Sequence, residues 1–348
     1  MPPPQPGGLR PDALAAFWQW WSSVKDHVAA AIANRALGQS PLVGYITTAV
    51  HNLSPDLAWE LGPGRSSQHN LTVTAEGNLL VRRLAAQWLA GAPPADPTWE
   101  YHDSRQPSSH LHLEIAGHRF APEDFRVSSV YDENRERFAI VLFHPEFSKA
   151  DDRLALQTAF LTLDQLLGED DVERWIGTID ASKSPPPGAA SLDQFKRAVA
   201  EARAKATGDH FVLGEGTSRD RKRVIVATNE GLKQIDHLDH VFHLKIGIAL
   251  RSPDANGFPA EEESGRLNAF EDQLETALGD NAVHIGRATW AGRRQIHLFV
   301  RDPTAASAAV DAWRQQLQPW QATSEVIYDP EWSAAKTGIY SMLAPRRG

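Results

Sequence analysis

The sequence predicts an α+β protein of two domains, the first opening on a long helix and the second ferredoxin-like. Three observations favour this fold class. The chain has 348 residues, more than a single compact domain commonly holds. A proline-rich segment divides it, and the pattern beyond that segment reads β-α-β-β-α-β. We therefore expect domains at residues 1–183 and 191–348, a linker at 184–190 and a ferredoxin-like core at about 239–330.

The linker is expected where the sequence reads SKSPPPGAA, from Ser182 to Ala190. Prolines, a glycine and small side chains favour a semi-rigid, exposed segment. Charge also changes here: residues 1–185 carry 15 basic and 23 acidic side chains, whereas residues 186–348 carry 20 and 21. Most of the net charge of −9 is therefore expected in the N-terminal half.

The C-terminal core is predicted to begin with a strand and a helix. Apolar and polar side chains alternate in VFHLKIGIAL, residues 241–250, which is typical of a half-buried strand. A helix is expected next, ending near Gly279, because apolar residues recur at helical spacing. These residues are Leu267, Phe270, Leu274 and Leu278. A second strand is predicted at Val283–Ile285.

The remaining core elements are a strand, a helix and a last strand. Ala291 and Gly292 mark a tight turn, after which residues 296, 298 and 300 alternate as in a strand. Asp302 followed by Pro303 predicts a helix start. The last strand is expected at residues 323–328. The whole series predicts a four-stranded antiparallel sheet with both helices on one face.

The N-terminal domain is predicted to open on a helix with an apolar stripe from Leu14 to Ile32, which Gly38 and Pro41 terminate. Two β-β-α-β series are expected after it. The first comprises residues 57–61, 71–74, 78–90 and 99–102, and the second comprises 125–131, 138–143, 152–167 and 172–179. The acidic run at residues 169–171 is interpreted as a solvated turn before the last strand.

Aromatic side chains on the opening helix are a candidate partner-binding surface. Phe17, Trp18 and Trp21 can share one helical face. Packing of this face against a sheet is one interpretation. The alternative is an exposed stripe in which Trp18 and Trp21 bind a partner protein.

Composition excludes several classes of protein. The chain has no cysteine, which excludes disulfides, thiol catalysis and cysteine-based zinc sites. No apolar run approaches 18 residues and the first ten residues lack an apolar region, so we expect no membrane span and no secretory signal. A cytoplasmic protein is therefore expected, and its alanine, arginine and proline content suggests a bacterial source. The acidic net charge argues against direct nucleic-acid binding, and the basic run at 219–223 is interpreted as a hairpin loop.

The strongest candidate for chemistry is a metal site at His110, His112 and Glu114. On a strand these three side chains project on one face, and two imidazoles and a carboxylate suit a divalent transition metal. His102 or His118 could add a ligand. The alternative interpretation is the solvated face of an amphipathic strand, in which case no cofactor is expected.

Other candidates are weaker. His237, His240 and His243 are spaced by three, but the strand pattern that begins at Val241 places them on different faces, so we do not expect them to share a metal. No nucleophile-elbow or phosphate-loop motif occurs. Trp332, in the segment DPEW, is expected to close the edge of the core.

Together these segments resemble a known family. The helix LNAFEDQLETALGD, the strands VHIGRATWAGRRQIHLFV, the helix AASAAVDAWRQQL and the ending EVIYDPEW are similar to the bacterial family catalogued as domain of unknown function 695, over residues 235–340. The helix at FWQW, the strand and turn at 71–77, and LGEDDVERWIGTID resemble the N-terminal region of some members. The implied C-terminal fold is similar to that of the regulator of ribonuclease E activity B, which inhibits a nuclease by binding it. The resemblance implies no catalytic residues.

Three functions remain open. The first is a non-enzymatic binding or regulatory protein that acts through an unidentified protein partner, which fits the acidic charge and the missing catalytic motifs. The second is a metal-dependent hydrolase that uses His110, His112 and Glu114. The third is a self-assembling structural protein, such as a homodimer formed through exposed sheet faces. We favour the first, and so expect no enzymatic activity.

Overall fold

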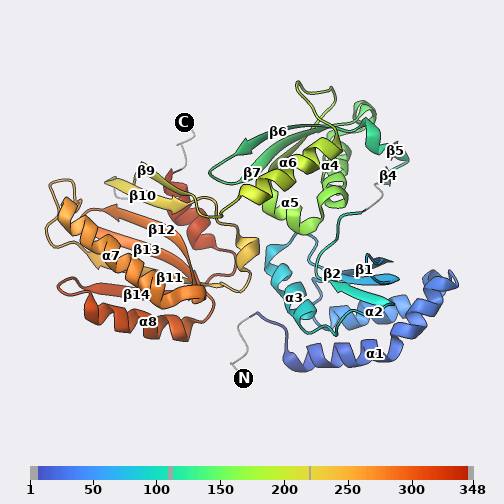
Figure 1. Cartoon of the computed structure of the whole chain (residues 1–348), viewed down its shortest axis with the longest axis horizontal. Coiled ribbons are helices and arrows are strands. Elements are labelled where there is room, and N and C mark those ends of the chain that lie inside the picture. The colour runs from blue at the N-terminus through green and yellow to red at the C-terminus, as the bar shows by residue number, and fades with distance from the viewer. Residues whose placement is uncertain (1–6, 109–112, 219–220, 344–348) are drawn as a thin grey trace. The chain divides into compact units, whose positions relative to one another are not determined.

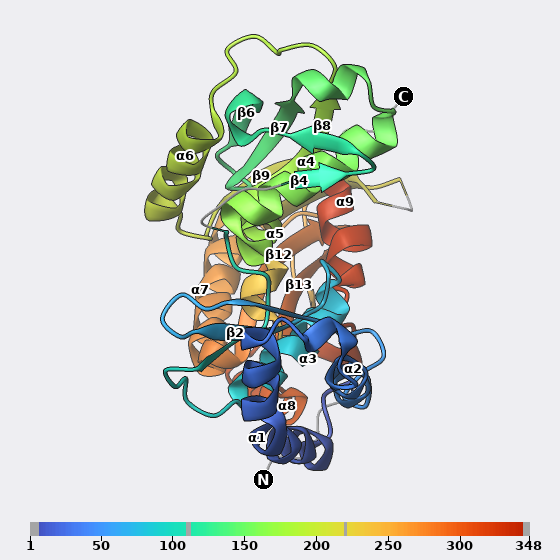
Figure 2. The ribbon, with the colours of Figure 1, turned by 90° about the vertical axis from the view of Figure 1, so that its right-hand side faces the viewer.

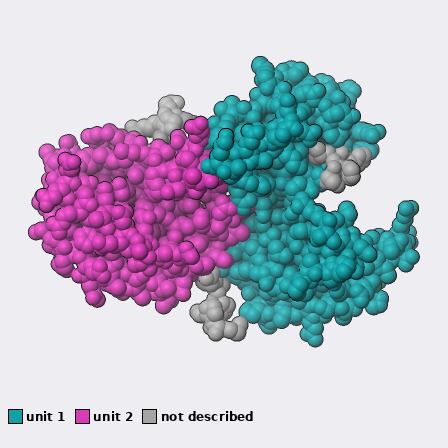
Figure 3. All heavy atoms as spheres, in the orientation of Figure 1, with its two compact units in different colours: residues 1–132, 137–205 teal, residues 133–136, 206–348 magenta. Residues whose placement is uncertain are grey.

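The computed structural model describes residues 7–108, 113–218 and 221–343 and has a mixed α+β architecture (Figure 1). It divides into two compact units (Figure 3). The first unit contains residues 1–132 and 137–205, and the second contains 133–136 and 206–348. Among the described residues, no helix is both long enough and apolar enough to cross a membrane.

The units divide after Lys205, whereas the sequence predicted a boundary at residues 184–190. Helix α6 (Leu192–Lys205) accounts for the difference, because it packs on the first unit. The rings of Phe195 and Phe138 meet edge to face, with centroids 5.5 Å apart, and Ala190 forms a β-bridge with Val127. With α6 included, the first unit carries 18 basic and 23 acidic side chains, and the second carries 17 and 21. The charge is therefore shared almost evenly between the structural units.

The first unit contains both predicted β-β-α-β series. It begins with α1 (Pro11–Ala33) and α2 (Leu42–His51). The first series is β1 (Ala58–Pro63), β2 (His69–Thr74), α3 (Leu79–Ala90) and β3 (Trp99–His102). Short strands β4 (Leu113–Ile115) and β5 (His118–Phe120) follow. The second series is β6 (Arg126–Asp132), β7 (Arg137–Phe143), α4 (Asp152–Leu167), α5 (Glu169–Trp175) and β8 (Ile176–Ser182).

Each series forms a three-stranded sheet, β1-β2-β3 and β6-β7-β8. In both sheets the first two strands pair antiparallel and the third pairs parallel to the second. The predicted strand at 172–179 starts later, at Ile176, because residues 169–175 form α5. Helix α2 was not expected from the sequence.

Trp18 and Trp21 lie in the core of the first unit. Trp18 stacks on Trp88 with ring centroids 4.8 Å apart, and the indole N–H of Trp21 donates a hydrogen bond of 3.1 Å to the hydroxyl of Tyr101. Trp21 has no exposed surface and Trp18 retains 9%. The structure therefore favours the packing interpretation, and the hypothesis that these two side chains form an exposed partner-binding stripe is corrected.

The second unit contains one antiparallel sheet of six strands, in the order β14-β11-β13-β12-β10-β9. Its strands are β9 (Phe211–Thr217), β10 (Arg223–Asn229), β11 (Phe242–Ala249), β12 (Ala282–Trp290), β13 (Arg293–Val300) and β14 (Ala322–Tyr328). Its helices are α7 (Glu261–Leu278), α8 (Pro303–Gln316) and the short α9 (Tyr340–Leu343). The Asp302 carboxylate caps α8, as its sequence predicted, by accepting hydrogen bonds from the backbone N–H of Thr304 and Ala305.

The two faces of this sheet are covered differently. Helices α7 and α8 share one core with the alternating apolar residues of β11 and β13, such as Ile246 and Ile296. The C-terminal segment covers the other face, where Trp332 stacks on Phe299 with ring centroids 4.6 Å apart. Gly286 forms a bulge in β12 with φ +149°, where an added Cβ would lie 2.2 Å from the carbonyl oxygen of Ala227.

Candidate binding groove

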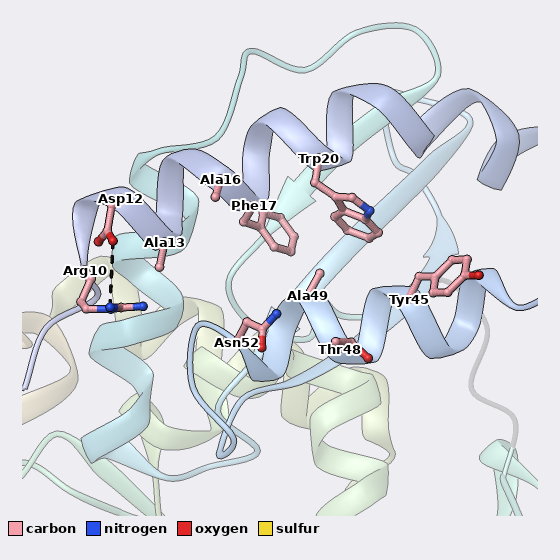
Figure 4. A pocket seen from close by; sticks show the side chains of 10 residues that line it. All are labelled: Arg10, Asp12, Ala13, Ala16, Phe17, Trp20, Tyr45, Thr48, Ala49 and Asn52. Atoms are coloured by element: carbon pink, nitrogen blue, oxygen red, sulfur yellow. Dashed lines mark ion pairs between the residues drawn. The ribbon is translucent and has the colours of Figure 1, made fainter.

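A groove of about 760 Å³ lies between α1 and α2 in the first unit. The two helices lie side by side (Figure 2). Each contributes residues at helical spacing, so that one row of side chains lines each wall (Figure 4). Helix α1 contributes Ala13, Ala16, Phe17 and Trp20, and α2 contributes Tyr45, Thr48, Ala49 and Asn52.

The groove exists because α1 presents two different faces. Trp18 and Trp21 point into the core, whereas Ala13, Ala16 and Trp20 line the groove. The alanines are small and leave open space between the helices, while Trp20 and Tyr45 supply aromatic surface toward one end (Figure 4). Small alanine side chains beside exposed aromatic surface suit an apolar occupant.

Charge is confined to the other end of the groove. Of the lining residues, only Arg10 and Asp12 are charged; they pair with each other at 3.9 Å, and each side chain is 76% exposed. Tyr45 is 57% exposed, so the groove is open to solvent along its aromatic end. An occupant would therefore present an uncharged, apolar surface to most of the groove.

The residues of the predicted metal site are only partly described. His110 and His112 lie outside the described residues. Glu114 is exposed on β4, directly across from Arg119 on β5. His118, a possible additional ligand, has its Nδ1 3.5 Å from a carboxylate oxygen of Glu146. Within the described part of the chain, no three His, Asp or Glu side chains are placed to hold a metal ion, so the metal site stays a prediction.

His102, the other possible ligand, pairs with a buried carboxylate. Its Nε2 lies 3.0 Å from Oε1 of Glu100, which also accepts hydrogen bonds from the backbone N–H groups of Arg65, Ser66 and Ser67. Burial alone would raise the pKa of Glu100, but these hydrogen bonds lower it well below its usual range. Glu100 therefore fixes the loop after β1, and His102 belongs to that structural network.

The second histidine cluster does not converge on one point. His243 on β11 stacks against His297 on β13, with its Nε2 3.1 Å from Nδ1 of His297. His240 pairs instead with the carbonyl oxygen of Asp280, and the ring of His237 stacks on Trp332. Burial lowers the pKa of His243 and lowers that of His297 to about 3. Both rings are thus neutral packing elements near pH 7.

The lowered pKa values of these buried histidines imply that the stability of the second unit depends on pH. The unfolded chain has ordinary histidine pKa values near 6.5, whereas the pKa of folded His297 is about 3. Below about pH 6.5 the unfolded state therefore binds more protons. The second unit is expected to lose stability, by on the order of a few kcal/mol, as the pH falls from about 6.5 toward 3.

Urea unfolding of the full chain at a series of pH values tests this expectation. His297→Gln should flatten the loss between about pH 6.5 and 5, where few carboxylates titrate. His27→Gln, which changes an exposed histidine on α1, is the control and should show the same dependence of stability on pH as the wild type. Equal profiles for wild type and His297→Gln would contradict the assignment to His297.

Of the groove residues, the sequence pointed only to Phe17. Trp20 lies off the helical face shared by Phe17, Trp18 and Trp21, and Tyr45 belongs to the unexpected helix α2. A signal was present: residues 45, 48, 49 and 52 follow helical spacing with small or aromatic side chains. Without α2, however, α1 has no opposite wall.

A comparison with protein families bears on the second unit. Residues 217–335 match the model of DUF695, a family of unknown function. This confirms the resemblance predicted for the C-terminal region, and the DUF695 region lies wholly within the second unit. The groove lies outside it, and the similarity to the regulator of ribonuclease E activity B stays a prediction. No curated protein matches the chain.

Proposed function

We propose that this chain is a non-enzymatic binding protein whose α1–α2 groove receives an amphipathic helix of a partner protein. The spacing of the lining residues carries the proposal. Residues 13, 16, 17 and 20 of α1 and 45, 48, 49 and 52 of α2 each repeat as i, i+3, i+4, i+7. A third helix with the same spacing would place its apolar side chains between the two rows.

The side chains that line the groove indicate what kind of segment it can bind. Apart from Arg10 and Asp12 the lining residues are uncharged, and only Thr48 and Asn52 among them have strongly polar side chains, so we expect the buried face of the partner helix to be uncharged and mostly apolar. Pockets for small molecules usually enclose most of their ligand, whereas Tyr45 leaves this groove open at its aromatic end. From Ala13 to Trp20 each wall spans two helical turns, about 10 Å. A short helical segment bound weakly and reversibly fits these dimensions.

A matched pair of variants tests the groove. Ala16 and Ala15 are adjacent and both exposed on α1, but only Ala16 lines the groove. Arginine is a good helix former, so Ala16→Arg and Ala15→Arg should both fold. A library of amphipathic helical peptides with varied apolar positions is selected for binding to the full chain. The binding of the enriched peptide to each variant is then measured by fluorescence anisotropy.

Ala16→Arg is expected to weaken peptide binding by about tenfold or more, because a charge would be buried on the groove floor. Ala15→Arg should bind like the wild type. The proposal fails if no helical peptide is enriched, or if the enriched peptides bind the two arginine variants equally well.

We also infer that β11, α7, β12, β13, α8 and β14 form a ferredoxin-like core. Their chain order β-α-β-β-α-β and their spatial order β14-β11-β13-β12 support this inference, as does the single core that both helices share. On this view β9 and β10 extend the sheet beyond the core. An experimental structure with a different strand order in this region would overturn the inference.

A further inference from the structure

Strand β9 forms one edge of the six-stranded sheet and carries exposed apolar side chains. Phe211 is 49% exposed and Leu213 is 72% exposed. Both project from the same face of the strand because they are two residues apart. Soluble proteins usually protect such edges with prolines, lysines or a covering element, and the sequence of β9, FVLGEGT, contains neither proline nor lysine.

The hydrogen-bond register identifies which backbone groups of β9 face outward. Just beyond the ends of the strand, Ser218 N–H donates to Lys222 O, and Glu230 N–H donates to His210 O. Since pairing alternates along an antiparallel ladder, the even-numbered residues of β9 bond to β10. The N–H and C=O groups of residues 211, 213, 215 and 217 therefore point away from the sheet.

One face of β9 is covered and the other is open. Helix α9 lies against the face of β9 that Gly216 occupies, where a Cβ on Gly216 would come within 2.5 Å of the carbonyl oxygen of Met342. On the opposite face, Leu213, Ile225 and Phe258 line a hollow of about 240 Å³, to which polar side chains such as Arg287 and Arg294 also contribute. The outward edge and this hollow adjoin one another through Leu213.

We propose that β9 pairs antiparallel with β9 of a second copy of this chain about a two-fold axis. An antiparallel edge is its own complement under such an axis, because each outward N–H meets an outward C=O of the copy. Charge does not oppose the pairing: Glu215, the only charged residue of β9, already forms an ion pair with Arg223 of β10. The apolar side chains of both copies would then join on the open face.

Sedimentation of the full chain at increasing concentration tests the proposal. The wild type is expected to approach the mass of two chains, each of 38.4 kDa. Leu213→Lys places a charge in the interface and should weaken dimerisation by about tenfold or more. Val130→Lys is the matched control, because Val130 is 70% exposed on β6, an edge strand of the first unit, and should leave the dimer intact.

The absence of native cysteine permits a direct test of the register. Single variants Phe211→Cys, Leu213→Cys and Glu215→Cys are oxidised, and the residue at the two-fold axis should cross-link to its copy, since paired Cα atoms lie about 5.5 Å apart. Val130→Cys should remain uncross-linked. A monomer at every concentration, or a dimer that dissociates with Val130→Lys but not with Leu213→Lys, would overturn the proposal. Stable monomers that bind a foreign extended peptide at β9 would overturn it as well.

Discussion

Glu169→Ala is expected to lower the free energy of unfolding of the first unit by about 3–5 kcal/mol. The Glu169 side chain is 6% exposed at the first residue of α5. It accepts hydrogen bonds from the Thr74 hydroxyl and from the backbone N–H groups of Gly77 and Arg105, the last two at 2.8 and 3.1 Å. Removing the carboxylate leaves the buried Thr74 hydroxyl without its acceptor and releases the two backbone N–H groups that it holds.

Asp152→Ala is the matched control for Glu169→Ala. Asp152 is also an acidic residue at the start of a helix, but its side chain is 92% exposed and pairs with Lys183 at the surface. It should leave stability nearly unchanged. Hydrogen exchange of the full chain, read by mass spectrometry in rising urea, assigns the loss to peptides of the first unit. Similar protection in the two variants would contradict a structural role for Glu169.

The acidic run at residues 169–171 shows where sequence reasoning failed. Three consecutive acidic residues after a glycine are typical of a solvated turn. The structure corrects this interpretation because the partners come from distant segments. Arg82 on α3 binds the Asp170 carboxylate with two hydrogen bonds of 3.0 and 2.9 Å, and it also pairs with Asp103. No local pattern around residue 170 contains that information.

The second unit could be predicted more fully because its elements depend on local signals. The alternation from Phe242 to Ala249 sets which face of β11 is buried, and the aspartate-proline start of α8 fixes that helix end. Strands β9 and β10 appeared only as a hairpin around a basic loop. Their place at the sheet edge depends on pairing between β10 and β12, whose residues lie about 60 positions apart along the chain.

The candidate groove shows how far a binding surface can be predicted from the sequence. Sequence reasoning identified the aromatic cluster of α1 but named Trp18 and Trp21, not Trp20, in the alternative interpretation of a partner-binding stripe. Helical spacing shows which side chains share a face, but not which face a neighbouring helix will leave open. That depends on α2, whose β-branched residues, such as Ile46 and Val50, do not favour a helix by themselves.

Glu271→Ala is expected to destabilise the second unit by about 3–5 kcal/mol. Glu271 lies at helical spacing from Leu267, Leu274 and Leu278, within the apolar stripe of α7, and its side chain is 2% exposed. It accepts a hydrogen bond of 2.7 Å from Arg294. The Arg294 side chain is 4% exposed, so loss of the carboxylate leaves a buried cation whose remaining hydrogen bonds among the described residues are to the neutral oxygens of Asn268 and Ser264.

A double variant distinguishes the cost of leaving a buried charge unpaired from the cost of losing a contact. Glu271→Met combined with Arg294→Met removes both charges and fills the space with apolar side chains, which is often neutral for a buried pair. The double variant should therefore be more stable than Glu271→Met alone in urea unfolding. Arg287, the other partner of Glu271, is 32% exposed and can be solvated. If the two substitutions lower the free energy of unfolding additively, this account is contradicted. If the double variant recovers stability, Glu271 fixes the position of α7 on the sheet without adding net stability.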